Sequence, residues 1–327
     1  MSDVRDMMLS SLDRVMEDTL TTAERAAADG HGMSGKVWAA LAEQGMTALG
    51  EAGNEIGYAD AMALVRRAAF HAAPVPLAET IAARRLLSRA GITLPEGPIA
   101  LAVPGTSGTA LVPWGRAVER VVVARGDKLV LLETAGAVQS TGINQAGEPR
   151  DGLDLARARV DAEAELRSAA DAVLAEGALV RAVQLSGALE KTLEHCLVWV
   201  NDRVQFGRPI ARFQAIQHAM AVLASETAAA RAAVDLAIEA SQTEADRLAV
   251  AIAKSRAGEA AGKAANIAHA AFGAMGFTRE HALHYSTRRL WAWRDEFGGE
   301  PYWQAEIGRR VAAAGGRHLW ATLTAIG

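Results

Sequence analysis

A segment of strand-like sequence, residues 96–155, interrupts a chain that otherwise has the apolar periodicity of α-helices. The segment consists of short runs rich in Val, Leu and Ile, separated by Gly, Pro and Asp, a pattern typical of short strands joined by turns. Within it, VVVARGDKLVLL predicts a β-hairpin that turns on Gly126 and Asp127. On both sides of the segment, apolar residues recur every three or four positions, as on one face of a helix. We therefore predict a mainly α-helical protein with a small β insert.

These changes of pattern predict three domains: an N-terminal helical domain at 1–95, a small β domain at 96–155 and a helical bundle at 156–327. Half of the residues are hydrophobic but only 5% are aromatic, and alanine is abundant in the predicted helices. Small side chains let helices approach one another, so we expect a closely packed bundle.

Charge and cysteine content exclude several classes of function. A net charge of -4 gives no support for nucleic-acid binding, which needs clustered Lys and Arg. Cys196 is the only cysteine, so we expect no internal disulfide, and a reducing cytoplasm fits this best. The pair His281 and His284 is weak support for a metal site, and we expect none. No apolar stretch of about 18 residues is found, which predicts no membrane insertion.

One segment raises two alternatives on chemical grounds alone. In RVQFGRPIARFQAIQHAMA, Pro209 predicts a turn between two helices, and Arg203 carries a guanidinium that suits a phosphate. Arg203 could equally pair with an acidic neighbour at a helix end. Phe206, Ile216 and Met220 are expected in the core.

The same segment resembles the Arg-x-x-Phe-Gly-x-x-(Ile/Leu)-x-x-(Phe/His)-Gln motif of the acyl-CoA dehydrogenase family. Downstream, AHAAFGAMGFTREHALHYSTRRL is similar to the family's Gln-x-x-Gly-Gly-x-Gly-(Phe/Tyr)-Thr-x-Glu-His segment. Upstream, LAEQGMTALGEAGNEIGYADAMALVRRA followed by PVPLAET resembles its N-terminal helical domain. The resemblance covers nearly the whole chain. It implies an N-terminal helical domain, a middle small β-sheet domain and a C-terminal four-helix bundle.

The resemblance also implies FAD as cofactor and a dimer or tetramer, homomeric or heteromeric, because these motifs reach the FAD held mainly by a neighbouring subunit. The residues that match the FAD-contacting positions are Arg203, Gln205, Phe213, Gln214, Gly273 and Gly276. Glycines at the last two positions would let backbone amides approach the pyrophosphate. Ala270 stands where the family has Gln, and the neighbouring His269 is a candidate replacement. The middle domain lacks the family's Thr-Glu-Pro-x-x-Gly-Ser-Asp loop and offers only Thr106 and Ser107 as hydroxyl donors.

The implied reaction is FAD-dependent α,β-dehydrogenation of an acyl-CoA thioester, with electron-transfer flavoprotein as the electron acceptor. A Glu base removes the α proton while the β hydride passes to flavin N5.

The position of this base leaves three alternatives. In the family, a Glu-Gly pair stands about twenty residues after the Gly-(Phe/Tyr) pair. Counting from Phe277 leads to Phe297, so Glu296, one position earlier, is the candidate base. Other family members carry the base on the first bundle helix, where this chain has Gly177 next to Glu176. The third alternative is that Glu296 is solvated at a helix end and the chain is a catalytically silent subunit that completes the FAD site of a partner.

Overall fold

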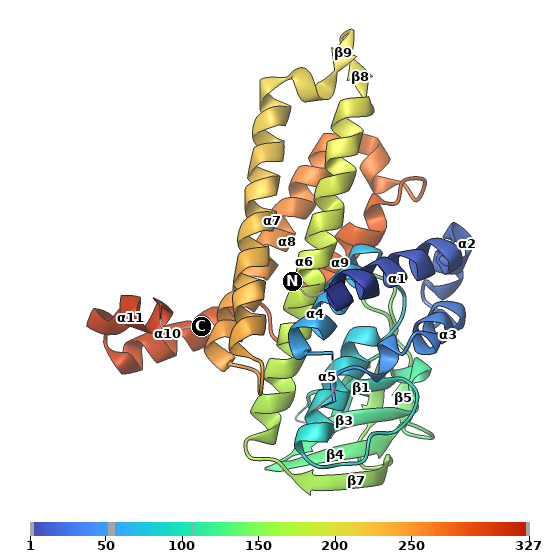
Figure 1. The fold of residues 1–327 in the computed structure, drawn as a ribbon, viewed down its shortest axis with the longest axis vertical. Coiled ribbons are helices and arrows are strands. Elements are labelled where there is room, and N and C mark those ends of the chain that lie inside the picture. Colours follow the sequence, from blue (N-terminus) through green and yellow to red (C-terminus); the bar gives the residue numbers. More distant parts are fainter. Residues whose placement is uncertain (1–2, 52–55, 106–107, 325–327) are drawn as a thin grey trace.

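The computed structural model describes residues 3–51, 56–105 and 108–324, which form a helical domain, a small β domain and a helical bundle (Figure 1). The N-terminal helices pack beside the lower half of the bundle and above the sheets in this view. They are α1 (Asp3–Thr19), α2 (Thr22–Ala28), α3 (Gly35–Glu43), η1 (Met46–Ala48), α4 (Tyr58–Phe70) and α5 (Leu77–Arg89).

The β domain contains two small sheets, with strand orders β1-β3-β4-β7 and β2-β6-β5. The predicted hairpin is confirmed: β3 and β4 pair antiparallel and turn at Gly126 and Asp127, with Arg125 opposite Lys128. The elements are β1 (Ile99–Leu101), β2 (Thr109–Pro113), η2 (Gly115–Ala117), β3 (Arg120–Arg125), β4 (Lys128–Glu133), β5 (Val138–Ser140), β6 (Arg150–Asp154) and β7 (Arg159–Glu165).

Three long helices and one shorter helix, α6 to α9, form the C-terminal bundle and confirm the predicted fold class. A short hairpin joins the first two at one end of the bundle, and two further helices project from its side (Figure 1). The elements are α6 (Ala169–Asp202), β8 (Val204–Gln205), β9 (Arg208–Pro209), η3 (Ile210–Arg212), α7 (Gln214–Ala240), α8 (Arg247–Phe272), η4 (Gly273–Phe277), α9 (Leu283–Asp295), α10 (Glu300–Ala314), η5 (Gly316–His318) and α11 (Leu319–Thr324).

Helix α6 is the centre of the molecule and contacts helices of the N-terminal domain, strand β3 and the other bundle helices. It is long and apolar enough to cross a membrane, but 89% of its most apolar window is buried inside the protein. Gly187 on α6 lies so close to the backbone of Arg66 on α4 that a side chain there would overlap it. The buried alanines of α8 serve the same close packing, as the composition predicts.

Two details differ from the sequence-based expectations. Helical structure does not return at residue 156, because β7 extends the first sheet to Glu165. The sequence RVDAEAE has few large apolar side chains but pairs with β4 as an edge strand. Phe206 is not in the core: it lies at the turn of the β8-β9 hairpin with a φ of 51° and is 90% exposed.

Candidate active site and cofactor contacts

Glu296 ends helix α9 and is buried, with only 4% of its surface exposed. Its Oε1 lies 2.6 Å from Nη1 of Arg150 and accepts a hydrogen bond of 3.1 Å from Asn144. Its Oε2 accepts a hydrogen bond of 2.8 Å from Nε of Arg181 and lies 2.7 Å from Nη2 of the same residue. The expectation that Glu296 could be merely solvated at a helix end is therefore wrong.

These contacts leave Glu296 poorly suited to accept a proton. Burial raises the pKa of its carboxyl. Arg181, Arg150 and the hydrogen bond from Asn144 together lower this pKa by more than burial raises it, so it lies below the ordinary value. A base for carbon acids works best with a pKa near the operating pH and an oxygen that faces the substrate. The assignment of Glu296 as the base stays a prediction that this geometry does not favour.

The same contacts join the three domains through a buried polar network. Arg181 on α6 also pairs with Glu79 on α5 at 2.7 Å. Asn144, in the loop between β5 and β6, donates to Glu148 as well as to Glu296. Trp293 on α9 donates its indole N–H to Glu148 at 2.9 Å. A buried network that satisfies its charges in this way fixes the relative positions of the domains.

Phe297 fills the place where the resemblance puts a base. Its backbone has a φ of 54°, and its ring packs directly on Gly177 of α6, where an added Cβ would overlap the ring. The guanidinium of Arg181 lies 5.6 Å from the ring centroid. Positions 297 and 177, at which family members carry their base, are thus adjacent in space and hold a phenyl ring against a glycine.

Glu176, the second candidate base, is also occupied by structural contacts. It is fully buried and accepts a hydrogen bond of 2.8 Å from the hydroxyl of Tyr58. Nη1 of Arg85 donates to both of its oxygens, at 3.1 and 3.0 Å. These partners come from α4 and α5, so Glu176 ties the N-terminal domain to the bundle.

An open hollow of about 610 Å³ lies between the β domain and the loop that follows α9. Its walls are mostly apolar, with Leu111 and Pro113 of β2 on one side and Phe297 on the other. Arg150 and Asp295 supply its charged groups, and Glu296 does not line it. Thr106 and Ser107, the expected hydroxyl donors, lie outside the described residues.

The predicted FAD-contacting residues of the first motif lie at the far end of α6. Arg203 ends this helix, and Arg203, Gln205 and Gln214 are exposed. Within the described part of the chain, their side chains have no hydrogen-bond partner, so they can contact a molecule from outside. Phe213 is half-buried and meets the ring of Phe206 edge to face, with centroids 6.0 Å apart.

The second motif lies beside the first. Trp199 of α6 stacks on Phe272 at 4.6 Å and donates its indole N–H to the carbonyl of Ala271. Gly273 is exposed and has a φ of 60° with a ψ of -139°, a conformation that requires glycine. Gly276 is buried, and an added Cβ would overlap Phe272, so it serves packing. Its backbone is less accessible to a pyrophosphate than that of Gly273.

The two groups of candidate residues are far apart. Arg181 contacts Glu296, and Arg203 ends the same helix 22 residues later, a separation of about 33 Å at the rise of an α-helix. The hairpin therefore cannot complete a reaction centre beside Glu296 in the same chain.

Comparisons with known proteins agree with this architecture. Residues 166–295 match the family model for the acyl-CoA dehydrogenase C-terminal domain. The chain is 31% identical to the acyl-CoA dehydrogenase IpdE2 of Mycolicibacterium smegmatis over 307 residues, which cover 88% of this chain and 93% of that protein. It is 32% identical to IpdE2 of Mycobacterium tuberculosis over 82% of this chain and 84% of that protein. The chain belongs to the acyl-CoA dehydrogenase family.

Solved structures with the acyl-CoA dehydrogenase fold superpose over nearly the full length. The Tcur3481-Tcur3483 steroid acyl-CoA dehydrogenase G363A variant matches with a TM-score of 0.87 at 20% identity, covering 95% of this chain and 98% of that one. The ChsE4-ChsE5 complex from Mycobacterium tuberculosis matches with a TM-score of 0.83 at 18% identity and the same coverage. At these identities the likeness shows the fold.

In this member of the acyl-CoA dehydrogenase family, sequence reasoning missed the partners of Glu296. Arg150 and Asn144 lie in and beside short strands and carry no motif. Arg181 did give a signal, because it stands alone among apolar residues in the helix GALVRAVQLSGAL. A charge in such a position needs a buried counter-charge, so Arg181 predicts an acidic partner.

Proposed function

We propose that this chain takes part in FAD-dependent α,β-dehydrogenation of an acyl-CoA thioester as a subunit that does not supply the base. It would contribute Arg203, Gln205, Phe213 and Gln214 to FAD held mainly by a partner chain. The observation that carries the proposal is that Phe297 and Gly177 fill the two family positions for the base, while Glu296 is bound by two arginines.

The properties of the hairpin support this division of roles. FAD, when bound, supplies the acceptor for the β hydride. The guanidinium of Arg203 can pair with pyrophosphate oxygens, and the amide of Gln214 can bond a ribose or adenine edge. Both side chains face solvent, and Arg203 lies about 33 Å along α6 from Arg181, the partner of Glu296, which suits contact with another chain's cofactor. Among the structural neighbours, the ChsE4-ChsE5 complex pairs two different chains.

A second candidate is an enzyme in which this chain itself catalyses the reaction with Glu296 as base. The position of Glu296, next to a residue that lines the open hollow, favours it. Both proposed functions use acyl-CoA as the substrate and electron-transfer flavoprotein as the electron acceptor.

The visible spectrum of the purified protein separates the two. The proposal predicts a colourless chain when purified alone and a yellow complex when a partner chain of the same family is co-expressed. In that complex, Arg203→Met should weaken FAD retention by about 10- to 100-fold, because it removes charge-assisted hydrogen bonds to phosphate. Arg157→Met, which removes an exposed guanidinium between β6 and β7, is the matched control and should retain FAD.

Flavin bands in the chain purified alone, bleached by acyl-CoA and no longer bleached in Glu296→Gln, would refute the proposal and support the second candidate. If the complex retains FAD equally well with Arg203→Met and with Arg157→Met, the β8-β9 hairpin does not bind the cofactor.

A further inference from the structure

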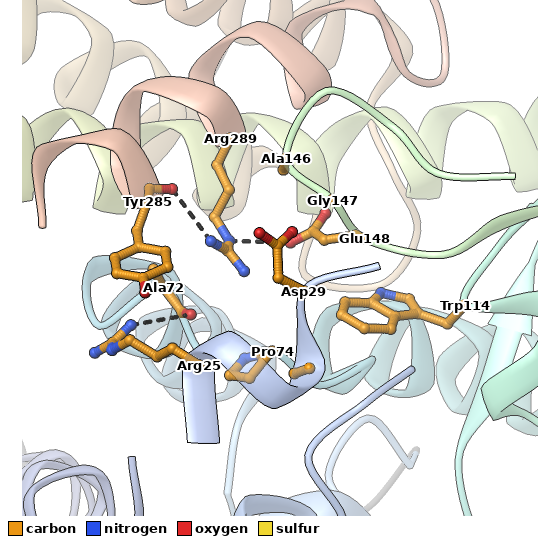
Figure 2. Close-up of a pocket in the computed structure, with 11 residues that line it drawn as sticks. Arg25, Asp29, Ala72, Pro74, Trp114, Ala146, Gly147, Glu148, Tyr285 and Arg289 are labelled. Atoms are coloured by element: carbon orange, nitrogen blue, oxygen red, sulfur yellow. Dashed lines mark hydrogen bonds and ion pairs between the residues drawn. The ribbon is translucent and has the colours of Figure 1, made fainter. Parts of the chain in front are cut away.

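The three domains also meet around a second, smaller hollow, which has about 20 Å³ of water-accessible space and shares no lining residue with the first. Helix α2 forms its floor and α9 its roof in Figure 2, with Trp114 and the loop before β6 at one side. Two guanidinium groups, those of Arg25 and Arg289, line it together with the carboxylates of Asp29 and Glu148. Arg25 and Asp29 lie outside the family motifs quoted from the sequence, whereas Pro74, Tyr285 and Arg289 fall within those segments at positions to which no cofactor role was assigned.

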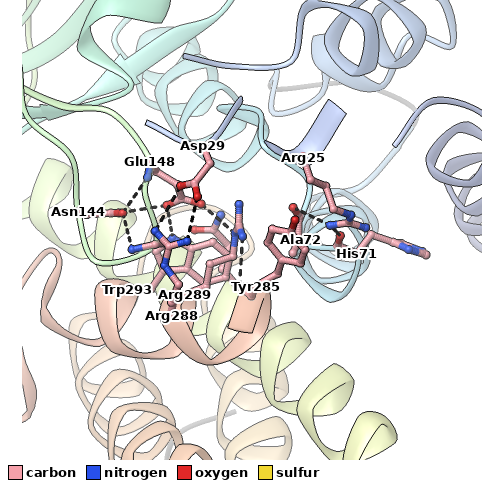
Figure 3. Close-up of polar contacts among 12 residues, drawn as sticks. Arg25, Asp29, His71, Ala72, Asn144, Glu148, Tyr285, Arg288, Arg289 and Trp293 are labelled. Carbon is pink, nitrogen blue, oxygen red and sulfur yellow. Dashed lines mark hydrogen bonds and ion pairs between the residues drawn. The ribbon is translucent and has the colours of Figure 1, made fainter. Parts of the chain in front are cut away.

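Arg25 enters the hollow without a carboxylate partner. Its Nη1 donates to the carbonyls of His71 and Ala72 at 2.6 and 3.4 Å, at the end of α4 (Figure 3). The left-handed backbone of Ala72, with a φ of 52°, belongs to this turn. Within the described residues, no carboxylate lies within ion-pair distance of Arg25. Burial, and then the positive charge of Arg289, lower the pKa of Arg25 to about 10.

Arg289 is buried and only partly engaged. Its Nε lies 3.0 Å from Glu148, and its Nη1 donates to the carbonyl of Tyr285 at 3.1 Å. Its Nη2 has no hydrogen-bond partner among the described residues.

The charges around the hollow do not balance. Arg288 pairs with Asp29 at 3.1 and 3.2 Å, and Arg289 pairs with Glu148 (Figure 3). Arg288 does not line the hollow, but it neutralises Asp29, so Arg25 is the one lining guanidinium that has no carboxylate partner among the described residues. Arg25 is half-buried, and a charge that has lost part of its hydration without gaining an ion-pair partner is costly, so a bound counter-ion would stabilise this arrangement.

We propose that this hollow binds one small monovalent anion, either a halide or a small carboxylate such as formate, between Arg25 and Arg289. The single excess charge favours a monovalent ion over phosphate or sulfate. The apolar walls from Pro74, Trp114 and Ala146 leave space for an ion and exclude a large organic acid. Because Arg25 lies on α2 and Arg289 on α9, the anion would hold the N-terminal domain against the bundle.

Thermal unfolding of the full chain, in its complex if it purifies as one, tests the proposal at constant ionic strength. Sodium chloride and sodium formate should raise the Tm relative to sodium gluconate, whose anion is too large for the hollow. At about thirty times the Kd of the anion we expect a rise of about 3 °C. In crystals grown with bromide, an anomalous peak should lie between Arg25 and Arg289.

Arg25→Gln should abolish the difference between chloride and gluconate, whereas the control Arg157→Gln should keep it. The proposal is overturned by equal Tm values in the three salts, or by a chloride effect that survives in Arg25→Gln. If Arg25→Gln does not fold, the bromide peak in the wild-type protein decides, and its absence from the hollow refutes the site.

Discussion

Replacing Glu296 by Gln removes one negative charge from the buried network and keeps the shape of the side chain. The carboxylate now pairs with Arg181, which is 1% exposed, and with Arg150, whose side chain is 27% exposed. Loss of one partner of a buried ion pair costs about 3–5 kcal/mol, because the remaining charge stays buried. Glu79 still compensates Arg181, and Arg150 can regain some hydration, so we expect a loss of about 3 kcal/mol in the free energy of unfolding.

Urea and thermal unfolding at pH 7 measure this loss, which corresponds to a fall in Tm of about 4 °C for a chain of this size. The matched control is Asp295→Asn at the preceding position. The side chain of Asp295 is 72% exposed and its nearest cation lies 4.0 Å away. Its replacement should change the free energy of unfolding by no more than about 0.5 kcal/mol.

The pH dependence gives an independent check of the sign. The pKa of Glu296 in the folded protein lies below the ordinary 4.5, so its stabilising effect is complete above about pH 4.5 and is lost as the pH falls through the folded value. The difference in the free energy of unfolding between the wild type and Glu296→Gln should therefore become smaller as the pH falls below about 4.5. A variant as stable as Asp295→Asn at pH 7 would show that the ion pairs do not form and would return Glu296 to candidacy as the base.

Two further perturbations test the surroundings of the first hollow. Gly177→Ala should cost about 1–3 kcal/mol by overpacking against Phe297, and the loss should shrink in the background Phe297→Ala, which a double-mutant cycle measures. Lys254 is buried and donates to the carbonyls of Arg294 and Gly298, and burial lowers its pKa from 10.5 to about 7. The unfolded chain keeps this proton up to about pH 10.5, whereas the folded chain releases it near pH 7. The free energy of unfolding of the wild type relative to Lys254→Met should therefore rise by at least about 1 kcal/mol between pH 7 and pH 9. A difference between the two proteins that does not change with pH would contradict this prediction.

The fold could be predicted from sequence where local pattern and tertiary packing agree. The hairpin at Gly126 and Asp127 joins two apolar strands, and both signals indicate the same structure. Strand β7 was missed because its sequence has alternating charged residues and few apolar ones. It forms a strand by pairing with β4, which lies some thirty residues earlier in the chain. Phe206 was misplaced because an aromatic residue normally indicates a core, whereas here the hairpin turn holds it outward.

The site was harder to predict, because its chemistry depends on contacts between distant segments. Counting along the motif leads to the loop after α9, where Glu296 and Phe297 stand next to each other. Which of the two faces the hollow depends on the φ of 54° at Phe297 and on the space above Gly177. Whether Glu296 is free depends on Arg150, which is 146 positions away. No local pattern contains either fact.

The charge balance around Glu296 also limits how a base could be introduced at the family position. Arg150 and Arg181 face Glu79 and Glu296, so the cluster is neutral. Phe297→Glu alone would add a third carboxylate beside Arg181, and Glu296→Gln alone would leave one positive charge in excess. The double variant restores neutrality. We therefore expect it to be more stable than the sum of the single changes predicts, by about 1–3 kcal/mol in a double-mutant cycle. Additive losses would mean that the two positions do not share Arg181, and the ion pairs of Glu296 would then not be the reason why position 297 carries no carboxylate.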